Sequence, residues 1–390
     1  MRARRYQLNK DTVAIIERGH PWIFREQLSS AATIFADGDW LPLVDGANKV
    51  VGHGIFEAEG AIAIRVVRRG PEVPDAAYFA SQLATAIAKR APLAARTDGI
   101  RLLDGESDGI PAISIDRFGD AIVIASYSAG SDAIARYLGR VLPALDEQRE
   151  LVGPATSITL RPAKRRRVAA LPERALRGTT PEIAHFTEDS IAYAVDLAEG
   201  HKTGAYLDLR GLRHDLATAA LRDLRVLNLF SYTGMLARAC EAAGATSITS
   251  VDASERALAF AAEYHVVDRE LHAFVRADVF DWLPAHPASE TYDLVIVDPP
   301  SMTSSMAQVP KALAAYRKLY KAAARHVRPH GAIVAACCTS RIERARFHHT
   351  VSEALGHRFK KTRELTPELD HPVGFPQADY LKIAWWRRTQ

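Results

Sequence analysis

Two adjacent cysteines, Cys337 and Cys338, end the apolar run GAIVAACC in a chain that has only three cysteines in total. Cysteine can form a disulfide, bind a metal, pack as a small apolar side chain or act as a covalent nucleophile. Three cysteines at this spacing make neither a disulfide framework nor a tetrahedral metal site, and adjacent cysteines pair poorly because disulfide geometry is demanding. We therefore expect no metal site, and the pair is left as packed side chains or as a nucleophile.

Three carboxylates close successive apolar stretches that are typical of strands: Asp252 in SITSVD, Asp278 in AFVRAD and Asp298 in DLVIVD. In a doubly wound sheet such residues lie at the edge where ligands bind. Asp252 follows Asn228 by 24 residues, which suits an acid that binds ribose hydroxyls, and Asp278 could accept from an adenine amino group. A single carboxylate is as often a helix N-cap, but three at one edge favour a positively charged nucleoside ligand.

The loop that follows the strand RVLNLF has the sequence SYTG and contains one glycine, Gly234. A dinucleotide site uses three glycines so that the backbone can approach a pyrophosphate. The loop therefore disfavours NAD. S-adenosylmethionine, with its ammonium and sulfonium charges, fits the three carboxylates better.

The elements that would position these residues alternate between strand and helix from about residue 182 onward. Apolar strands such as RVLNLF and SITSVD are separated by helical stretches such as MLARACEAAG, a pattern typical of a doubly wound, mainly parallel α/β sheet. The segments RFKKTREL and DYLKIAWWRR resemble a final pair of strands with no helix between them. They predict an antiparallel edge.

Two further domains are expected before this sheet. The first 72 residues alternate apolar strands with turn signals and predict a small β-rich domain. Glycine and prolines in RGPEVPD mark its end, and mixed helices and strands over 73–181 predict a central α+β domain. We therefore expect domains over 1–72, 73–181 and 182–390.

The composition is that of an ordinary globular protein, with 48% apolar and 25% charged residues among 390. No stretch approaches the roughly 20 apolar residues of a membrane span, and MRARRYQLNK lacks the apolar core of a secretory signal. We therefore expect a cytoplasmic protein without membrane association. The net charge is only +4, but cations cluster, most densely in RPAKRRR. Each cluster alone is typical of solvated surface, and several together favour nucleic acid as a partner.

Four segments, LNLFSYTGMLA, SVDASERAL, RADVFDWL and VIVDPPS, resemble the motifs of class I S-adenosylmethionine-dependent methyltransferases. GHPWIFREQL resembles the opening of an RNA-binding PUA domain. RLLDGESDGIPAISIDRFGD and EGHKTGAYLDLRGLRH resemble the central domain, and the entry to the catalytic domain, of bacterial large-subunit ribosomal RNA (cytosine-5)-methyltransferases. The resemblance covers nearly the whole chain in the same order. It implies a Rossmann-like methyltransferase domain preceded by a PUA-like domain and a central α+β domain.

The same resemblance implies which residues bind the cofactor and the RNA. S-adenosylmethionine would contact Tyr206, Asn228, Phe230, Ser231, Tyr232, Thr233, Gly234, Asp252, Ala253, Asp278, Val279 and Asp298. The RNA would contact Lys202, Pro299, Pro300, Arg165, Arg166 and Arg167. The implied partner is large-subunit ribosomal RNA, naked or in an assembly intermediate, and a homodimer is also implied.

The chemistry of cytosine methylation connects the cysteine pair with Asp298. Carbon 5 of cytosine is a poor nucleophile, which needs a thiolate at carbon 6 and an acid near nitrogen 3. Aligned on the apolar strand, Cys338 takes the place of the family's nucleophile, whereas Cys337 and Thr339 stand where serine is common. Because side chains alternate along a strand, only one cysteine can face the base. We expect this to be Cys338, with Asp298 as the acid and Cys337 packed against the neighbouring helix.

Ser301 follows the two prolines of VIVDPPS, where methyltransferases that act on amino groups usually have an aromatic residue. Two alternatives remain beside the cytosine reaction. A guanine-N7 ribosomal RNA methyltransferase of the same fold shares NLFSYTG but has no cysteine after the fifth strand. A non-catalytic RNA-binding protein of ribosome assembly would have no use for the row of carboxylates.

Overall fold

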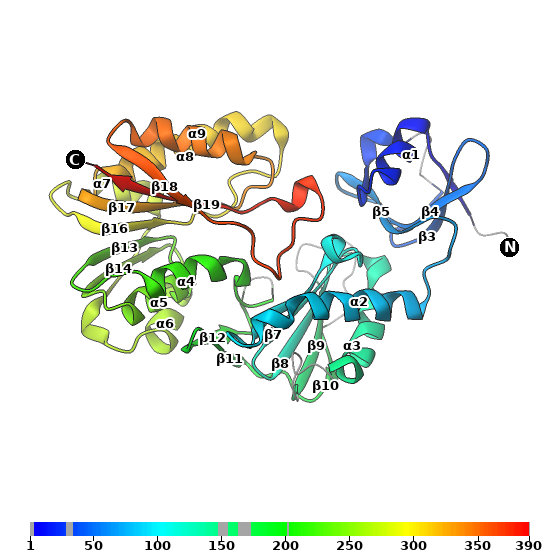
Figure 1. The fold of residues 1–390 in the computed structure, drawn as a ribbon, viewed down its shortest axis with the longest axis horizontal. Helices are drawn as coiled ribbons and strands as arrows, with labels where there is room; N and C mark the ends of the chain where they lie inside the picture. The colour runs from blue at the N-terminus through cyan, green and yellow to red at the C-terminus, as the bar shows by residue number, and fades with distance from the viewer. Residues whose placement is uncertain (1–3, 29–33, 147–154, 163–172, 201–202, 390) are drawn as a thin grey trace. The chain divides into compact units, whose positions relative to one another are not determined.

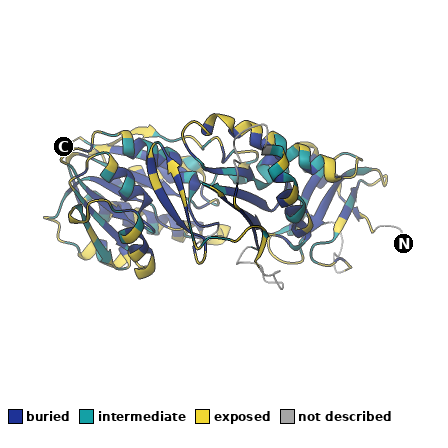
Figure 2. Ribbon diagram, turned by 90° about the horizontal axis from the view of Figure 1, so that it is seen from below, coloured by how far each residue is buried: buried dark blue, intermediate teal, exposed yellow. Residues whose placement is uncertain are grey.

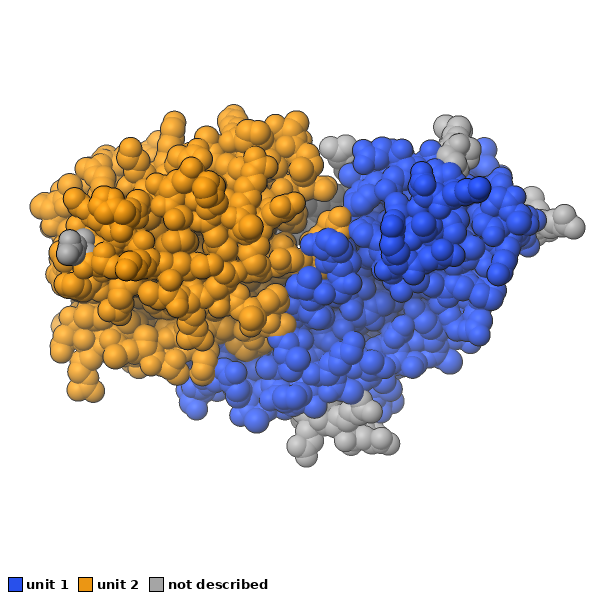
Figure 3. Space-filling model, turned by 45° about the horizontal axis from the view of Figure 1, so that its top comes forward, with its two compact units in different colours: residues 1–207, 369–376 blue, residues 208–368, 377–390 orange. Residues whose placement is uncertain are grey.

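The computed structural model describes residues 4–28, 34–146, 155–162, 173–200 and 203–389. The chain divides into two compact units, coloured in Figure 3, one of residues 1–207 and 369–376 and one of residues 208–368 and 377–390. The segment 369–376 thus belongs to the first unit, although the residues on either side of it belong to the second. In the described part of the chain, every helix is too short or too polar to cross a membrane.

The first unit begins with a five-stranded sheet whose strands lie in the order β1-β3-β4-β5-β2. Ile23, Leu43 and Ile64 are completely buried in its core, so this β-rich part has a core of its own. Its elements are β1 (Tyr6–Gln7), α1 (Lys10–Glu17), β2 (Trp22–Phe24), β3 (Trp40–Val44), β4 (Val50–Phe56) and β5 (Ile62–Arg69).

A second five-stranded sheet in the first unit has the order β10-β9-β8-β7-β6, and a separate hairpin pairs β11 with β12. Apolar residues of α2 and α3, among them Leu83 and Leu138, pack with the buried side chains of this sheet. The elements are α2 (Ala76–Arg90), β6 (Gly99–Asp104), β7 (Ile113–Phe118), β8 (Ala121–Ser126), α3 (Asp132–Asp146), β9 (Ser157–Pro162), β10 (Arg174–Arg177), β11 (Ile183–Glu188) and β12 (Ile191–Asp196).

Buried charges hold the segment 369–376 in the first unit. Arg90, at the end of α2, donates to both carboxylate oxygens of Asp108 at 3.0 and 2.5 Å and to the carbonyl of Asp370 at 3.2 Å. The carboxylate of Asp370 accepts from the backbone amide of Arg101 at 3.0 Å. Because Arg90 and Asp370 are completely buried, these bonds form where water cannot replace them.

The second unit forms, among its described residues, a seven-stranded sheet in the order β15-β14-β13-β16-β17-β19-β18. The first five of these strands are parallel, and β19 runs antiparallel to both β17 and β18. The predicted Rossmann-like fold with an antiparallel edge is therefore confirmed. The strands are β13 (Arg225–Leu229), β14 (Ser247–Asp252), β15 (His272–Arg276), β16 (Tyr292–Val297), β17 (Val327–Cys337), β18 (Phe359–Glu364) and β19 (Lys382–Arg388).

Helices cover both faces of this sheet (Figure 1). The helices α7, α8 and α9 lie on one face, where their apolar side chains share a core with Leu227, Val295 and Ile333 of the strands. The helices α4, α5 and α6 lie on the other face. The strands are accordingly buried, whereas the helices expose their outer sides (Figure 2). The helices are α4 (Arg210–Thr218), α5 (Met235–Ala242), α6 (Glu255–Tyr264), α7 (Val279–Ala285), α8 (Val309–Ala324) and α9 (Arg344–Leu355).

The ion pair between Arg90 and Asp108 should contribute strongly to the stability of the first unit. The substitution Asp108→Ala leaves a buried guanidinium without its carboxylate, which costs about 3–5 kcal/mol. We expect the free energy of unfolding, measured by urea denaturation, to fall by that amount. Glu72→Ala, which removes the exposed partner of Arg68, is the control and should cost less than about 1 kcal/mol. Equal losses would contradict a special contribution of the buried pair.

Candidate active site

The carboxyl ends of the parallel strands bring the predicted residues of the second unit to one edge of the sheet. Leu229 of β13 is level with both Val251 of β14 and Val297 of β16. Val297 is in turn level with Ala335 of β17. The loops that follow these four strands, the first at Phe230 and the last at Cys338, therefore all begin at the same edge, where open α/β sheets bind their ligands.

The loop after β13 has an unusual backbone. Phe230, Tyr232 and Gly234 have φ angles of 60°, 47° and 81°, so every second residue lies in the left-handed region. For a residue with a side chain this conformation costs about 1–2 kcal/mol. Strain of this kind persists only where the surroundings enforce it, and it is concentrated at functional sites.

Hydrogen bonds from neighbouring elements enforce this loop conformation. The amide of Ser231 donates to the carbonyl of Val251 at 3.1 Å, and the amide of Tyr232 donates to Oδ2 of Asp252 at 2.8 Å. Nδ1 of His265 lies 2.5 Å from the carbonyl of Thr233. Asp252, at the end of β14, thus holds the loop through one carboxylate oxygen.

Two of the three carboxylates also accept hydrogen bonds from backbone amides that follow them in the chain. Asp252 accepts from the amide of Ser254 through Oδ1 at 2.8 Å, and Asp278 caps α7 by accepting from the amide of Phe280 at 2.8 Å. A carboxylate oxygen has two lone pairs, so these bonds leave acceptor capacity for a ligand. The capping interpretation is therefore correct for Asp278, and it does not conflict with ligand binding.

Unsatisfied polar groups at this edge indicate room for a ligand. The side-chain amide of Asn228 and the hydroxyls of Ser231 and Ser250 are buried and lack hydrogen-bond partners in the described residues. Asn228 and Ser250 stand directly opposite each other on β13 and β14. A buried polar group without a partner costs about 1–3 kcal/mol. A polar cofactor with an amino acid and a ribose, such as S-adenosylmethionine, fits a site that offers such groups beside Asp252.

The two adjacent cysteines have different environments. Cys337, the last residue of β17, is completely buried in the core that includes Tyr316 and Tyr320 of α8. Cys338 is half-buried, and its thiol donates to the carbonyl of Pro299 at 3.7 Å. None of the three cysteines forms a disulfide. The expected packing of Cys337 against the neighbouring helix is confirmed, and Cys338 lies beside the loop that follows Asp298.

Thr339 joins the loop after β17 to the loop after β16. It is completely buried, and its hydroxyl accepts from the amide of Met302 at 3.2 Å and from the hydroxyl of Ser301 at 3.5 Å. The same hydroxyl shares a hydrogen bond of 3.0 Å with Tyr316 of α8. One side chain therefore connects the loop that carries the cysteines, the loop that carries the two prolines, and the helix between them.

Two tyrosines of α8, Tyr316 and Tyr320, pack against the end of β17, next to the cysteine loop. Burial, followed by the nearby thiol of Cys337, raises the pKa of Tyr316 above its usual value. Burial also raises the pKa of Tyr320 well above its usual value. Both phenols therefore stay protonated at neutral pH, and the hydroxyl of Tyr320 donates to the carbonyl of Ala336 at 2.8 Å.

The remaining predicted residues are distributed unevenly. Ala253 and Pro300 are exposed, Pro299 is buried, and Val279 is buried in the core at the start of α7. Tyr206 is half-buried and belongs to the first unit, so its contact with the cofactor stays a prediction. Four predicted RNA contacts lie outside the described residues: Arg165, Arg166, Arg167 and Lys202.

The sequence interpretation missed Lys382 and His265. The lysine interrupts an apolar strand, LKIAWW, and a charged residue in such a run is a signal that could have identified it. Nothing local distinguishes His265, whose contact with Thr233 depends on the packing of α6 against the loop.

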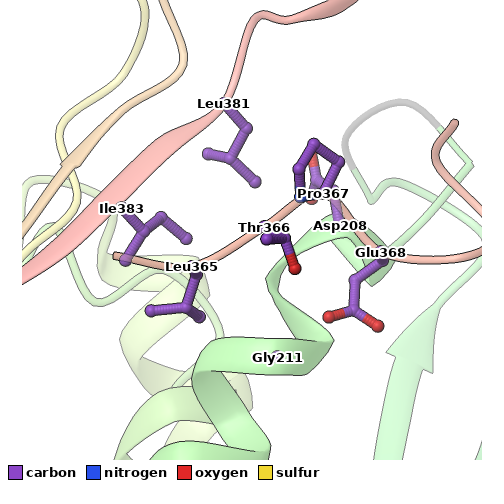
Figure 4. A pocket seen from close by; sticks show the side chains of 8 residues that line it. All are labelled: Asp208, Gly211, Leu365, Thr366, Pro367, Glu368, Leu381 and Ile383. Atoms are coloured by element: carbon purple, nitrogen blue, oxygen red, sulfur yellow. The ribbon is translucent and has the colours of Figure 1, made fainter. Parts of the chain in front are cut away.

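A pocket in the second unit lies next to the start of β19 (Figure 4). Ile383 lines it from β19, Leu381 lines it from the position before that strand, and Gly211 lines it from α4. The remaining lining residues are Asp208, Leu365, Thr366, Pro367 and Glu368. Because β19 begins opposite Cys337, the pocket lies close to the cysteine loop.

Comparisons with known families match both ends of the chain. Residues 159–382, more than half of the chain, match the model of an S-adenosylmethionine-dependent methyltransferase. Residues 7–69 match the model of a PUA-like domain. The predicted boundaries at 72 and 181 stay predictions, because the larger match begins at 159 and the second compact unit begins at 208.

Curated relatives match nearly the whole length. A ribosomal RNA large subunit methyltransferase of Deinococcus radiodurans is 31% identical over 98% of this chain and 96% of its own length. Ribosomal RNA large subunit methyltransferase I of Klebsiella pneumoniae is 32% identical over 94% of this chain and 93% of its own. A solved structure from Streptococcus mutans, assigned as a SAM-dependent methyltransferase, aligns with a TM-score of 0.83 over 98% of this chain and 99% of its own, at 22% identity. This last likeness shows the fold.

The hydroxyl of Thr339 should matter more than its methyl group. Thr339→Val keeps the shape but leaves the amide of Met302 without its acceptor, which costs about 1–3 kcal/mol. Thr339→Ser is the control, because it keeps the hydroxyl and loses one methyl group, worth about 0.8 kcal/mol. We expect a larger fall of the thermal midpoint for the valine variant. A larger fall for the serine variant would assign the role to packing.

The strained loop should not tolerate a side chain at Gly234. A Cβ atom there would lie 2.7 Å from Cβ of Ala261, at a φ of +81°, so Gly234→Ala adds a steric clash of about 1–3 kcal/mol to the backbone strain. We expect S-adenosylmethionine to bind at least about ten-fold more weakly, which corresponds to 1.4 kcal/mol, in isothermal titration. Gly244→Ala is the matched control, with a φ of +90° and no neighbour closer than 3.7 Å. Equal affinity of the two variants would contradict a loop conformation required for binding.

Proposed function

The chain, with its PUA-like domain, belongs to the S-adenosylmethionine-dependent methyltransferase family and has ribosomal RNA large subunit methyltransferases as relatives, and from this premise we propose that it methylates carbon 5 of a cytosine in large-subunit ribosomal RNA. The predicted family, fold and cofactor are thereby confirmed. The base that is modified and the covalent role of a cysteine are the content of the proposal.

The proximity of Cys338 to the loop after Asp298 is the observation that carries the proposal. The thiol of Cys338 lies 3.7 Å from the carbonyl of Pro299, the residue next to Asp298. The reaction at carbon 5 requires a thiol that can reach carbon 6 and a carboxyl group near nitrogen 3 of the same base. The strand ends bring these two groups to one edge of the sheet, and Thr339 fixes their loops against each other.

In the proposed mechanism, the thiolate of Cys338 adds to carbon 6 of cytosine and forms a carbon–sulfur bond. Asp298 assists at ring nitrogen 3 by hydrogen bonding or proton donation, so that electron density builds at carbon 5. S-adenosylmethionine, when bound, supplies an electrophilic methyl group. After carbon 5 has taken this group, its proton leaves to a base. The electrons of the broken bond restore the ring double bond and expel the thiolate.

The cofactor would be held by the residues at the ends of β13 and β14. The proposal assigns the ribose hydroxyls to Asp252 and the adenine amino group to Asp278. The amide of Asn228 and the hydroxyl of Ser231, which have no hydrogen-bond partner in the part of the chain that the structure describes, would bind polar atoms of the cofactor. Asp298, half-buried directly after β16, would lie between cofactor and base.

The substrate would be RNA in which the target base is free to leave its stack. This favours naked ribosomal RNA or an assembly intermediate, as the names of the relatives suggest for the class of RNA. The proposed activity takes place in the cytoplasm, where this RNA is found. Arg165, Arg166 and Arg167 remain proposed backbone contacts, with affinity that falls as salt rises.

The cysteine variants test the proposal. The protein is incubated with ribosomal RNA and methyl-labelled S-adenosylmethionine, and the labelled base is identified after digestion. We expect label in 5-methylcytosine with wild type and Cys337→Ala, and a loss of at least about 10²-fold with Cys338→Ala, because the covalent step is removed. Cofactor binding by Cys338→Ala, measured by titration, controls for folding.

RNA that contains 5-fluorocytosine gives a second readout. Because no proton can leave carbon 5, the covalent complex should accumulate and survive denaturing electrophoresis with wild type and Cys337→Ala only. Full methylation by Cys338→Ala would disprove the covalent role of this residue. Label in guanine would instead favour N7 methylation, and absence of cofactor binding would favour a non-catalytic RNA-binding protein.

A further inference from the structure

Lys382, the first residue of β19, is a completely buried lysine. Lysine is almost never fully buried unless its ammonium group is paired, because transfer of an unpaired charge into the protein interior is very costly. The mechanism proposed above gives this residue no role. We therefore looked for groups near Lys382 that a buried positive charge would stabilise.

The ammonium of Lys382 holds the cysteine loop directly. Nζ donates to the carbonyl of Thr339 at 2.8 Å and to the carbonyl of Tyr380 at 2.8 Å. Lys382 also stands opposite Cys337 in the antiparallel pairing of β17 and β19. An ammonium group has three N–H donors, so two backbone bonds leave one donor for a further partner.

The direction of the Lys382 side chain follows from the residues on either side of it in the chain. Leu381 and Ile383 line the pocket shown in Figure 4. Because successive side chains of a strand point to opposite faces, Lys382 points away from that pocket. It shares a face with Cys337, its cross-strand partner, on the side of the sheet that α8 and α9 cover.

The charged and ionisable groups around Lys382 come from the end of β17, from the segment before β19 and from α9. Burial lowers the pKa of Lys382, whereas Cys337, Asp379 and Cys338 raise it and Arg344 of α9 lowers it. Asp379 is itself bound by Arg344, which neutralises much of its charge. Besides this ion pair, the groups that act on Lys382 are the thiols of Cys337 and Cys338.

Of these two thiols, Cys337 has the larger effect on Lys382, but it cannot meet a substrate. It is completely buried, and Tyr316 packs against it in the core. Cys338 is half-buried and lies in the loop whose Thr339 carbonyl Lys382 binds. The accessible thiol that can use the charge is therefore Cys338.

We propose that Lys382 is a positioning residue for methyl transfer, which fixes the cysteine loop by its bond to the Thr339 carbonyl and supplies the positive charge that favours the thiolate of Cys338. The inference rests on the proposed function only for its role in methylation. The thiolate is the reactive form of cysteine, and an adjacent cation increases its fraction at neutral pH. The effect is present while Lys382 is protonated and is lost as the pH rises through the lysine pKa.

The reactivity of Cys338 tests this proposal without RNA. Native protein is alkylated with iodoacetamide between pH 6 and pH 10, a range chosen on either side of the usual cysteine pKa of about 8.5. Labelling of Cys338 is measured by mass spectrometry of its peptide, which distinguishes it from Cys337 and Cys240. In Lys382→Met we expect the midpoint of alkylation to rise by about one pH unit, which makes labelling at pH 7 about ten-fold slower.

Three variants separate charge from folding. Lys382→Gln keeps an N–H donor without the charge and should slow alkylation like Lys382→Met. Lys360→Met, on the exposed edge strand β18, is the matched control and should leave the profile unchanged. Binding of S-adenosylmethionine by titration shows that each variant is folded. If Lys382→Met fails to bind the cofactor, the pH profile of Cys338 alkylation in Lys382→Gln tests the proposal instead.

An unchanged alkylation profile of Cys338 in a folded Lys382 variant would overturn the proposal. With RNA, the same variants should methylate about ten-fold more slowly at pH 7 and recover as the pH rises, since the raised pKa of Cys338 then matters less. Methylation that is retained in Cys338→Ala would disprove the proposed function and leave the alkylation result intact. The two failures are thus distinguishable.

Discussion

The arrangement of the site depends on the hydrogen bonds of the Thr339 hydroxyl. This hydroxyl binds the loop after β16 through Met302 and Ser301 and the helix α8 through Tyr316. Parallel pairing brings the ends of β16 and β17 to one edge, but pairing ends at Val297 and Ala335. Beyond these residues the chains diverge into loops, and side-chain bonds must set their spacing. A thiol and a carboxyl group in such loops can serve one substrate only if that spacing is fixed.

The site combines strain with rigid support. The loop after β13 has two residues with side chains, Phe230 and Tyr232, in the left-handed region. Asp252 and His265 hold this loop from two other elements. The same carboxylate that braces the loop is the one proposed to bind the ribose. On this proposal, occupation of the site and the conformation of the loop are coupled through Asp252, because both depend on the orientation of one side chain.

The sequence predicted those parts of the site that follow from strand order. The positions of Asp252, Asp278 and Asp298 at one edge follow from the alternation of strands and helices, and the burial of Cys337 follows from alternation along a strand. Thr339 and Lys382 could not be predicted in the same way. The bond of Thr339 to Met302 spans 37 residues and that of Lys382 to Thr339 spans 43, so these roles depend on tertiary contacts that no local pattern records. The assignment of segment 369–376 to the first unit was missed for the same reason.

That segment has a consequence for how the chain acquires its structure during synthesis. Residues 1–207 leave the ribosome long before residues 369–376, which complete the same unit. Until then Arg90 lacks the carbonyl of Asp370, and Trp22 lacks the ring of Phe375, whose centroid lies 4.7 Å from its own. Domains generally fold in order from the amino end. The first unit therefore gains these last contacts only when the carboxyl-terminal end of the chain has been made.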